Sequence, residues 1–170
     1  LWERGEIKKM GVSVYCPEEA LHCLKDERIK CIQIPFNLID NRWLEIEFID
    51  ALKIRKDLEV QVRSIFLQGL LISKENVWPS FVTNTNEIIS AIKDLTTNLG
   101  RKSSIDLCIS YVKSFKWISG YVVGIDNLSQ LKEVISYDSN LPLSESDLEE
   151  IKYTFNNIPT KLLDPRKWNE

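Results

Sequence analysis

Residues 59–71, EVQVRSIFLQGLL, predict a strand followed by a tight turn. The first half of this stretch alternates apolar and polar side chains with the period of two that is typical of a strand. Gly69 then allows the backbone to turn tightly or to approach a ligand closely. Arg63 is unusual in such a strand, because a guanidinium is seldom buried without a partner. We therefore expect Arg63 to lie at the end of the strand and to point toward a ligand.

The chain length and composition are those of one soluble domain, and we treat residues 1–170 as a single unit. Hydrophobic residues make up 44% of the chain and charged residues 28%, which is ordinary for a globular protein. The net charge of −3 gives no reason to expect nucleic acid or an anionic membrane as a partner. No apolar run approaches the roughly 20 residues of a membrane span. The first ten residues lack the apolar core of a secretory signal, so we expect a cytoplasmic protein whose chain begins within a larger unit.

Neither the cysteines nor the histidine indicate a metal site. None of the four cysteines belongs to a CxxC pair, and we expect reduced, packed thiols, with disulfides as the alternative. His22 is the single histidine, and its spacing to Cys16 and Cys23 matches no zinc pattern. We expect it on a helix surface.

Strand patterns alternate with helix patterns along the whole chain. This alternation predicts a parallel sheet covered by helices. We expect strands within residues 6–15, 31–37, 59–65 and 121–124. Helix patterns cover residues 17–25, 44–56, 86–99 and 105–115, and two further helices follow Asn127 and Ser144, which have the side chains of N-caps.

The sequences of the last two helices also predict how one of them begins and which side of the other is buried. Ser144 is followed by Asp147 at the position of a capping box. Leu128, Leu131 and Ile135 form the apolar stripe of the helix that begins after Asn127.

Four segments in chain order resemble the last four strand units of the aldo-keto reductase family. They are GVSVY at 11–15, IQIPFNLID at 32–40, VRSIFLQGLL at 62–71 and VVGIDNLSQL at 122–131. DPRKW at 164–168 is similar to the tails of some bacterial members. The resemblance implies an α/β fold, a (β/α)8 TIM barrel of which this chain supplies the C-terminal half, strands five to eight.

A half barrel has consequences for assembly. A complete barrel takes about 250 residues, and its active site lies at the carboxyl ends of the strands. Four units alone leave two open sheet edges. We also expect an exposed, concave apolar face, formed by Val12, Val14, Ile32, Ile34, Val60 and Val62. Either a preceding half completes the barrel, or two copies of the chain associate.

The resemblance implies a nicotinamide cofactor, NADP or NAD, and assigns residues to it. Ser13 and Gln33 correspond to residues that bind the nicotinamide amide. Arg63 stands where an aromatic side chain usually stacks on the nicotinamide, and a planar guanidinium can also stack on a ring. The loop around the pyrophosphate corresponds to Ser64, Phe66 and Gln68. The adenosine-phosphate segment begins at Gly124, and Gln130 replaces an arginine that is common in NADP-dependent members.

Each assignment has an alternative. Ser13 and Gln33 could be satisfied interior polar groups, and Gly69 and Gly124 could be ordinary turn residues. Arg63 could pair with an acidic residue of the missing half.

The resemblance implies an oxidoreductase that reduces a carbonyl to an alcohol, with a sugar-like carbonyl as one candidate substrate. The family's catalytic aspartate, tyrosine, lysine and histidine belong to its first four strands, so we assign no catalytic residue here. None of the five tyrosines corresponds to the catalytic one, and we expect them outside the barrel mouth. A second hypothesis is a non-catalytic half barrel used for binding or assembly. A third is an unrelated phosphate-binding α/β domain.

Overall fold

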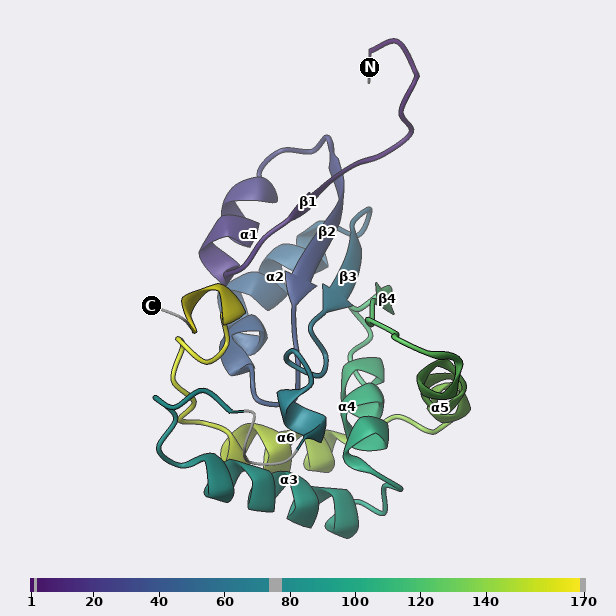
Figure 1. Ribbon diagram of the computed structural model, residues 1–170. Coiled ribbons are helices and arrows are strands. Elements are labelled where there is room, and N and C mark those ends of the chain that lie inside the picture. Colours follow the sequence, from purple (N-terminus) through teal and green to yellow (C-terminus); the bar gives the residue numbers. More distant parts are fainter. Residues whose placement is uncertain (2, 74–77, 169–170) are drawn as a thin grey trace.

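The computed structural model describes residue 1 and residues 3–73 and 78–168. Its centre is a parallel sheet in which the strands lie in the order β1-β2-β3-β4 (Figure 1). The strands are β1 Met10–Ser13, β2 Ile29–Pro35, β3 Glu59–Arg63 and β4 Gly120–Tyr121. The predicted parallel sheet is therefore confirmed, although β4 is shorter than expected and ends before Val122.

Helices connect the strands in the order that the sequence predicts. Helix α1 Pro17–Cys23 joins β1 to β2, and η1 Asn41–Leu44 with α2 Ile46–Ile54 joins β2 to β3. Between β3 and β4 lie η2 Leu70–Ile72, α3 Thr85–Asn98 and α4 Ser104–Lys113. After β4 come α5 Leu128–Asp138, α6 Glu145–Thr154 and η4 Pro165–Lys167.

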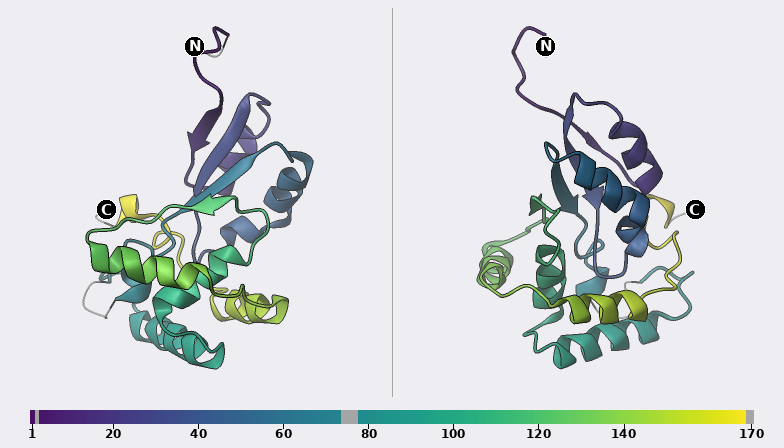
Figure 2. Two further views of the ribbon diagram at one scale, coloured as in Figure 1. Left: turned by 90° about the vertical axis from the view of Figure 1, so that its right-hand side faces the viewer. Right: turned by 180° about the vertical axis from the view of Figure 1, so that it is seen from behind.

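The two faces of the sheet differ in character. Val12, Ile32 and Val60 are paired across the neighbouring strands β1, β2 and β3, and we call such a set a register row. Ile32 and Val60 of this row are fully buried or nearly so. Helices α1 and α2 lie on one side of the sheet, and within the described residues no helix covers the other side (Figure 2). The neighbouring register row consists of Ser13, Gln33 and Gln61, and its side chains are exposed or half-buried.

The expectation of an exposed apolar sheet face is therefore wrong. Of the six residues expected there, five are buried within the chain itself and Val12 is half-buried. They belong to the same hydrophobic core as Ala20 of α1 and Phe48 of α2. Because side chains alternate between the faces of a strand, the apolar set faces the helices. The polar set remains on the open face.

Several local predictions are confirmed. Ser144 and Asp147 form a capping box at the start of α6, and the Asn127 side chain accepts a hydrogen bond from the Gln130 amide at the start of α5. Helix α3 agrees with the helix expected at 86–99 to within one residue at each end and is followed by Gly100, which has φ 61°. Ile88, Ile89, Ile92 and Leu95 form its buried side, while Leu99 is half-buried.

Helix α5 differs from its prediction. The expected stripe is exposed, with 64% of Leu128, 39% of Leu131 and 61% of Ile135 accessible to solvent. Val134 is the residue of α5 that is buried, and α5 contacts α4. The stripe therefore has no partner within the described residues. None of the described helices is long and apolar enough to cross a membrane.

Candidate functional site

The loop that follows β3 has an unusual backbone. Ser64, Leu67 and Gln68 have positive φ values of 58°, 45° and 56°, and Gly69 has φ 85°. Residues other than glycine seldom adopt this conformation, and such residues concentrate at functional sites. The buried side chains of Ile65 and Leu67 anchor the loop in the core.

The same loop leaves several backbone donors available. The Leu67 amide donates to the Ser64 carbonyl at 2.9 Å and the Leu71 amide donates to the Phe66 carbonyl at 3.3 Å. Four other amide N–H groups have no hydrogen-bond partner within the described residues, namely those of Ile65, Phe66, Gln68 and Gly69. Concave loops with free amide groups are suited to bind anions.

This loop forms one wall of a pocket of about 650 Å³. Residues 122–126 and one side of α5 form much of the rest, with Ile72 of η2 and Ile105 of α4. The pocket brings together six of the eight residues that the sequence assigns to a cofactor: Arg63, Ser64, Phe66, Gln68, Gly124 and Gln130. Asp126 and Glu133 also line it, so the α5 side carries negative charge.

Ser13 and Gln33 lie outside this pocket, on the open face of the sheet. They are register partners near the carboxyl ends of β1 and β2. The Ser13 hydroxyl lies 3.5 Å from the Gln33 Oε1. Arg63, at the end of β3, belongs to the same carboxyl edge and also lines the pocket. Since ligands of parallel sheets bind at the carboxyl ends of the strands, both groups have positions suited to one extended ligand.

Gln130 already has a structural role. The side-chain Oε1 of Gln130 accepts a hydrogen bond from the backbone amide of Asp126 at 2.8 Å. The backbone amide of Gln130 donates to Asn127 Oδ1 at 3.0 Å. The side chain thereby holds the turn that leads into α5. Its NH2 group remains the part that can contact a ligand.

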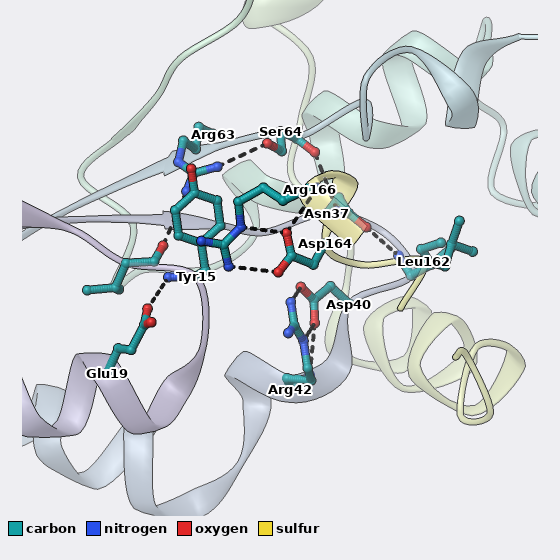
Figure 3. Close-up of polar contacts among 12 residues, drawn as sticks. Tyr15, Glu19, Asn37, Asp40, Arg42, Arg63, Ser64, Leu162, Asp164 and Arg166 are labelled. Atoms are coloured by element: carbon teal, nitrogen blue, oxygen red, sulfur yellow. Dashed lines mark hydrogen bonds and ion pairs between the residues drawn. The ribbon is translucent and has the colours of Figure 1, made fainter. Parts of the chain in front are cut away.

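A cluster of three residues at the strand ends was not predicted from the sequence. The guanidinium carbon of Arg63 lies 4.3 Å from the centroid of the Tyr15 ring, and that of Arg166 lies 3.4 Å from it (Figure 3). Tyr15 follows β1, whereas Arg166 belongs to η4. The tail of the chain therefore lies at the carboxyl edge of the sheet, and the expectation that all tyrosines lie outside the mouth is wrong for Tyr15.

Asp164 fixes the position of Arg166. Its carboxylate accepts two hydrogen bonds from the Arg166 guanidinium, at 2.8 and 2.7 Å. These bonds lower the pKa of the Asp164 carboxyl below its ordinary value, because they favour the charged form. Asp40 and Arg42 repeat the same two-residue spacing and the same paired bonds nearby. The same pattern with the same paired bonds also occurs at Asp26 and Arg28, just before β2, so the pattern by itself does not locate the cluster.

The family can now be assigned. The model of the aldo/keto reductase family matches residues 1–154. The chain belongs to the aldo/keto reductase family. No curated protein matches the sequence closely enough to be counted as similar.

Solved structures of aldo/keto reductases resemble this chain in fold. An aldo-keto reductase from Bacillus halodurans, in its holo form, has 19% sequence identity and a TM-score of 0.72, over 89% of this chain and 51% of that one. The glycerol dehydrogenase of Gluconobacter oxydans has 17% identity and a TM-score of 0.67, over 97% of this chain and 54% of that one. The chain therefore spans about half the length of these structures. The third hypothesis, an unrelated phosphate-binding domain, is wrong.

Asn37 connects the strand ends of this aldo/keto reductase chain to the loop after β3. Its Nδ2 donates to the Ser64 carbonyl at 3.4 Å, and its Oδ1 accepts from the Ile39 amide at 3.2 Å (Figure 3). Asn37 is buried, so it holds Ser64 at the first positive-φ position of the loop. No pattern in the sequence singles out this residue.

Within the described residues no group of three or more His, Cys, Asp or Glu side chains is arranged to hold a metal ion. His22 is exposed on α1, as predicted. The four cysteines are free thiols. Burial raises the pKa of the Cys108 thiol to about 12, so this residue stays protonated in the core.

Proposed function

We propose that this chain is the C-terminal half, strands five to eight, of an NAD(P)-dependent oxidoreductase that reduces a carbonyl to an alcohol. In this proposal residues 1–170 form one unit that carries much of the cofactor site. One observation carries the proposal: the positive-φ loop with its unpaired amides lines the same pocket as Arg63, Gly124 and Gln130. An extended cofactor with charged phosphates is the kind of ligand that such a pocket accommodates.

Each part of the cofactor has a proposed position. The amides of residues 65–69 and the Ser64 and Gln68 side chains bind the pyrophosphate, because free N–H groups suit phosphate oxygens. Ser13 and Gln33 bind the nicotinamide amide, for which their polar side chains at the strand ends are suited. Gly124 and Gln130 adjoin the adenosine end.

The cofactor, when bound, supplies the hydride. The residues of this chain bind it, orient the nicotinamide and exclude water from one side. Glutamine at position 130 replaces an arginine that would pair with a 2′-phosphate, so the proposal leaves both NADP and NAD as cofactors. The proton donor belongs to the half that precedes this one.

The remaining features of the proposal follow from the family resemblance and from the exposed stripe of α5. The partner of that stripe is the other half of the barrel or a second copy of the chain. The substrate is a small carbonyl compound, which the tail's similarity to bacterial members suggests to be sugar-like. We propose a cytoplasmic, bacterial-like enzyme without nucleic-acid or membrane partners.

Two glycines offer a matched test of the cofactor pocket. Gly69 and Gly100 both have positive φ, 85° and 61°, and an added Cβ has no neighbour within 4 Å at either position. Gly69 lines the pocket, whereas Gly100 ends α3. Gly69→Asp places a negative charge beside the phosphates, and we expect it to weaken NADPH binding, measured by fluorescence titration, at least tenfold. Gly100→Asp should bind NADPH like the unchanged protein. Equal affinity of both variants would contradict the proposed position of the cofactor.

A second candidate function is a non-catalytic half barrel. The observation that favours it is the exposed apolar stripe of α5, which offers a surface for assembly. Binding of NADPH without any turnover by the natural full-length chain would support this candidate over the enzyme.

A further inference from the structure

The guanidinium of Arg63 is only partly satisfied. It donates to the Val14 carbonyl at 3.3 Å and to the Ser64 hydroxyl at 3.5 Å. Both distances lie beyond the usual range of an N–H···O bond. A guanidinium has five N–H donors, and within the described residues Arg63 has no carboxylate partner. It is therefore a cation with donors left over, held at the edge of a pocket.

Arg166 adds a second group of donors beside it. Its Nε and Nη2 are occupied by Asp164, whereas Nη1 has no partner within the described residues. About half of the side chain, 53%, is exposed. Stacking on the Tyr15 ring holds both guanidinium groups in place, as expected for cation–π contacts.

Three carboxylates close to Arg166 and Tyr15 are already engaged or turned to another partner, whereas Asp126 and Glu133 line the α5 side of the pocket. Asp164 pairs with Arg166, and Asp40 pairs with Arg42. Glu19 is the remaining nearby carboxylate, and its Oε2 accepts a hydrogen bond from the Tyr15 amide at 2.7 Å on the α1 side (Figure 3). None of the three carboxylates bonds to Arg63. The group therefore offers N–H donors rather than acceptors at the carboxyl edge of the sheet.

We propose that Arg63 and Arg166 bind an anionic group of the substrate, so that the carbonyl compound reduced carries a carboxylate or a phosphate. This inference rests on the proposed function and deepens it, because it names the substrate class. Planar guanidinium groups bind carboxylates and phosphates through paired, charge-assisted hydrogen bonds. A substrate anchored there would lie next to the nicotinamide position near Ser13 and Gln33.

Three probes with one ring test the inference. 4-Formylbenzoate carries a carboxylate, 4-formylphenyl phosphate carries a phosphate, and methyl 4-formylbenzoate is neutral. Their affinities for the natural full-length protein are measured by calorimetric titration at low salt, without turnover. We expect at least one anionic probe to bind about tenfold more tightly than the ester, as one charge-assisted hydrogen bond implies. The stronger of the two anions identifies which group the site recognises.

Two arginines give the matched comparison. Arg166→Gln should remove the preference for the anionic probe and leave the affinity for the ester unchanged. Arg28 pairs with Asp26 at the same two-residue spacing, but it lies just before β2, at the opposite end of the strands. Arg28→Gln should therefore keep the preference. If Arg166→Gln fails to fold, Arg63→Gln should remove the preference in its place.

The outcomes separate this inference from the proposed function. Equal affinity for all three probes overturns the inference, and so does an equal loss of preference in Arg28→Gln. NADPH binding is titrated in parallel with no probe present. If NADPH binds and the anions show no preference, only the inference fails. If the anions are preferred but neither NADPH nor NADH binds, the proposed function fails and the assignment of the anion as a substrate group fails with it.

Discussion

The side chains of Ser13 and Gln33 lie together at the ends of adjacent parallel strands, with 3.5 Å between the serine hydroxyl and the glutamine Oε1. Their strands are also joined here by the Val14 amide, which donates to the Gln33 carbonyl at 3.0 Å. The glutamine oxygen therefore has a partner, and its NH2 group faces the open side of the sheet without one in the described residues. Such an amide can donate to a nicotinamide carbonyl.

Gln33→Ala should weaken binding of nicotinamide mononucleotide and leave binding of ADP unchanged. Losing one buried hydrogen-bonding partner costs about 1–3 kcal/mol, which corresponds to roughly a five- to hundredfold weaker affinity. Gln61→Ala is the control, because Gln61 lies in the same register row but outside the proposed site. Calorimetric titration of both variants with both half-cofactors measures the effect. An unchanged affinity of Gln33→Ala for the nicotinamide half would show that the assignment of Gln33 is wrong.

Gly69→Ala should destabilise the loop, whereas Gly124→Ala should not. Both glycines line the pocket, and an added Cβ has no neighbour within 4 Å at either one. They differ in backbone conformation, because only Gly69 has a positive φ, 85°. A side chain in that conformation costs about 1–2 kcal/mol. Urea denaturation of the two variants measures the difference, and equal midpoints would indicate that the loop relaxes.

The elements of this fold could be predicted where local chemistry decides them. The capping box of Ser144 and Asp147 needs only residues three apart, and the stripe of α3 is buried as its period indicates. Helix α5 shows the limit of the same reasoning. Its Leu128 and Ile135 have the spacing of a buried stripe but are exposed, because a pattern records what a helix can bury and not whether the partner lies in the same chain.

The site could be predicted in part for a related reason. The family resemblance selected Ser64, Gln68 and Gly124, and these residues line one pocket, although binding of a cofactor by them stays a prediction. The stacking of Arg166 on Tyr15 joins residues at opposite ends of the sequence. No periodicity or local motif reports such a contact, so only the three-dimensional structure could reveal it.

Asp164→Asn should make the tail less sensitive to acid. The pKa of Asp164 is lowered from its ordinary value of 3.8 by its bonds to Arg166. A depressed carboxyl pKa adds stability that is complete above the ordinary value and is lost as the pH falls through the lower, folded-state value. We therefore expect the unchanged protein to lose more stability between pH 5 and pH 3 than Asp164→Asn does. At pH 7 the variant should be slightly less stable, because solvent screens an ion pair in which about half of the Arg166 side chain is exposed.

Thermal melts of both proteins at several pH values measure this difference. Asp26→Asn serves as the control for an exposed pair of the same spacing, Asp26 and Arg28. Identical pH profiles of Asp164→Asn and the unchanged protein would show that the ion pair does not stabilise the folded state.

Residues 1–170 by themselves should associate in solution. The open sheet face is polar, and we expect the contact to use the α5 stripe, in which Leu128 and Ile135 are more than half exposed. Ile46 and Ile54 are also exposed, on α2. Exposed apolar patches mark interaction sites. Sedimentation should show species larger than 19.8 kDa, and the double variant Leu128→Ser, Ile135→Ser should shift them toward the monomer. Leu141→Ser, at a residue 79% exposed outside α5, should not. A folded, monodisperse 19.8 kDa species of the unchanged chain would contradict the prediction.

Residues 1–170 by themselves should show no NADPH-dependent reduction of a nitrobenzaldehyde. Hydride transfer to a carbonyl needs a proton donor at the developing alkoxide. Burial raises the pKa of Tyr111 above its ordinary value, and burial with a hydrogen bond to Asp138 raises that of Tyr121 to about 12. Both phenols are therefore poor acids near neutral pH. Tyr153 is exposed on α6, and Tyr137 accepts a hydrogen bond from the hydroxyl of Ser103, the N-cap of α4.

Among the described residues, Tyr15 is the remaining phenol that lies at the strand ends and could donate a proton. The variant Tyr15→Phe is therefore the decisive control. Joining an aldo/keto reductase N-terminal half to the chain should produce turnover, and changing the tyrosine of that half to phenylalanine should abolish it, while Tyr15→Phe should retain turnover. NADPH oxidation followed at 340 nm measures each step. Tyr15→Phe removes only the hydroxyl and keeps the ring that supports Arg63 and Arg166. Turnover by residues 1–170 that is lost in this variant would therefore show that the chain contains its own acid.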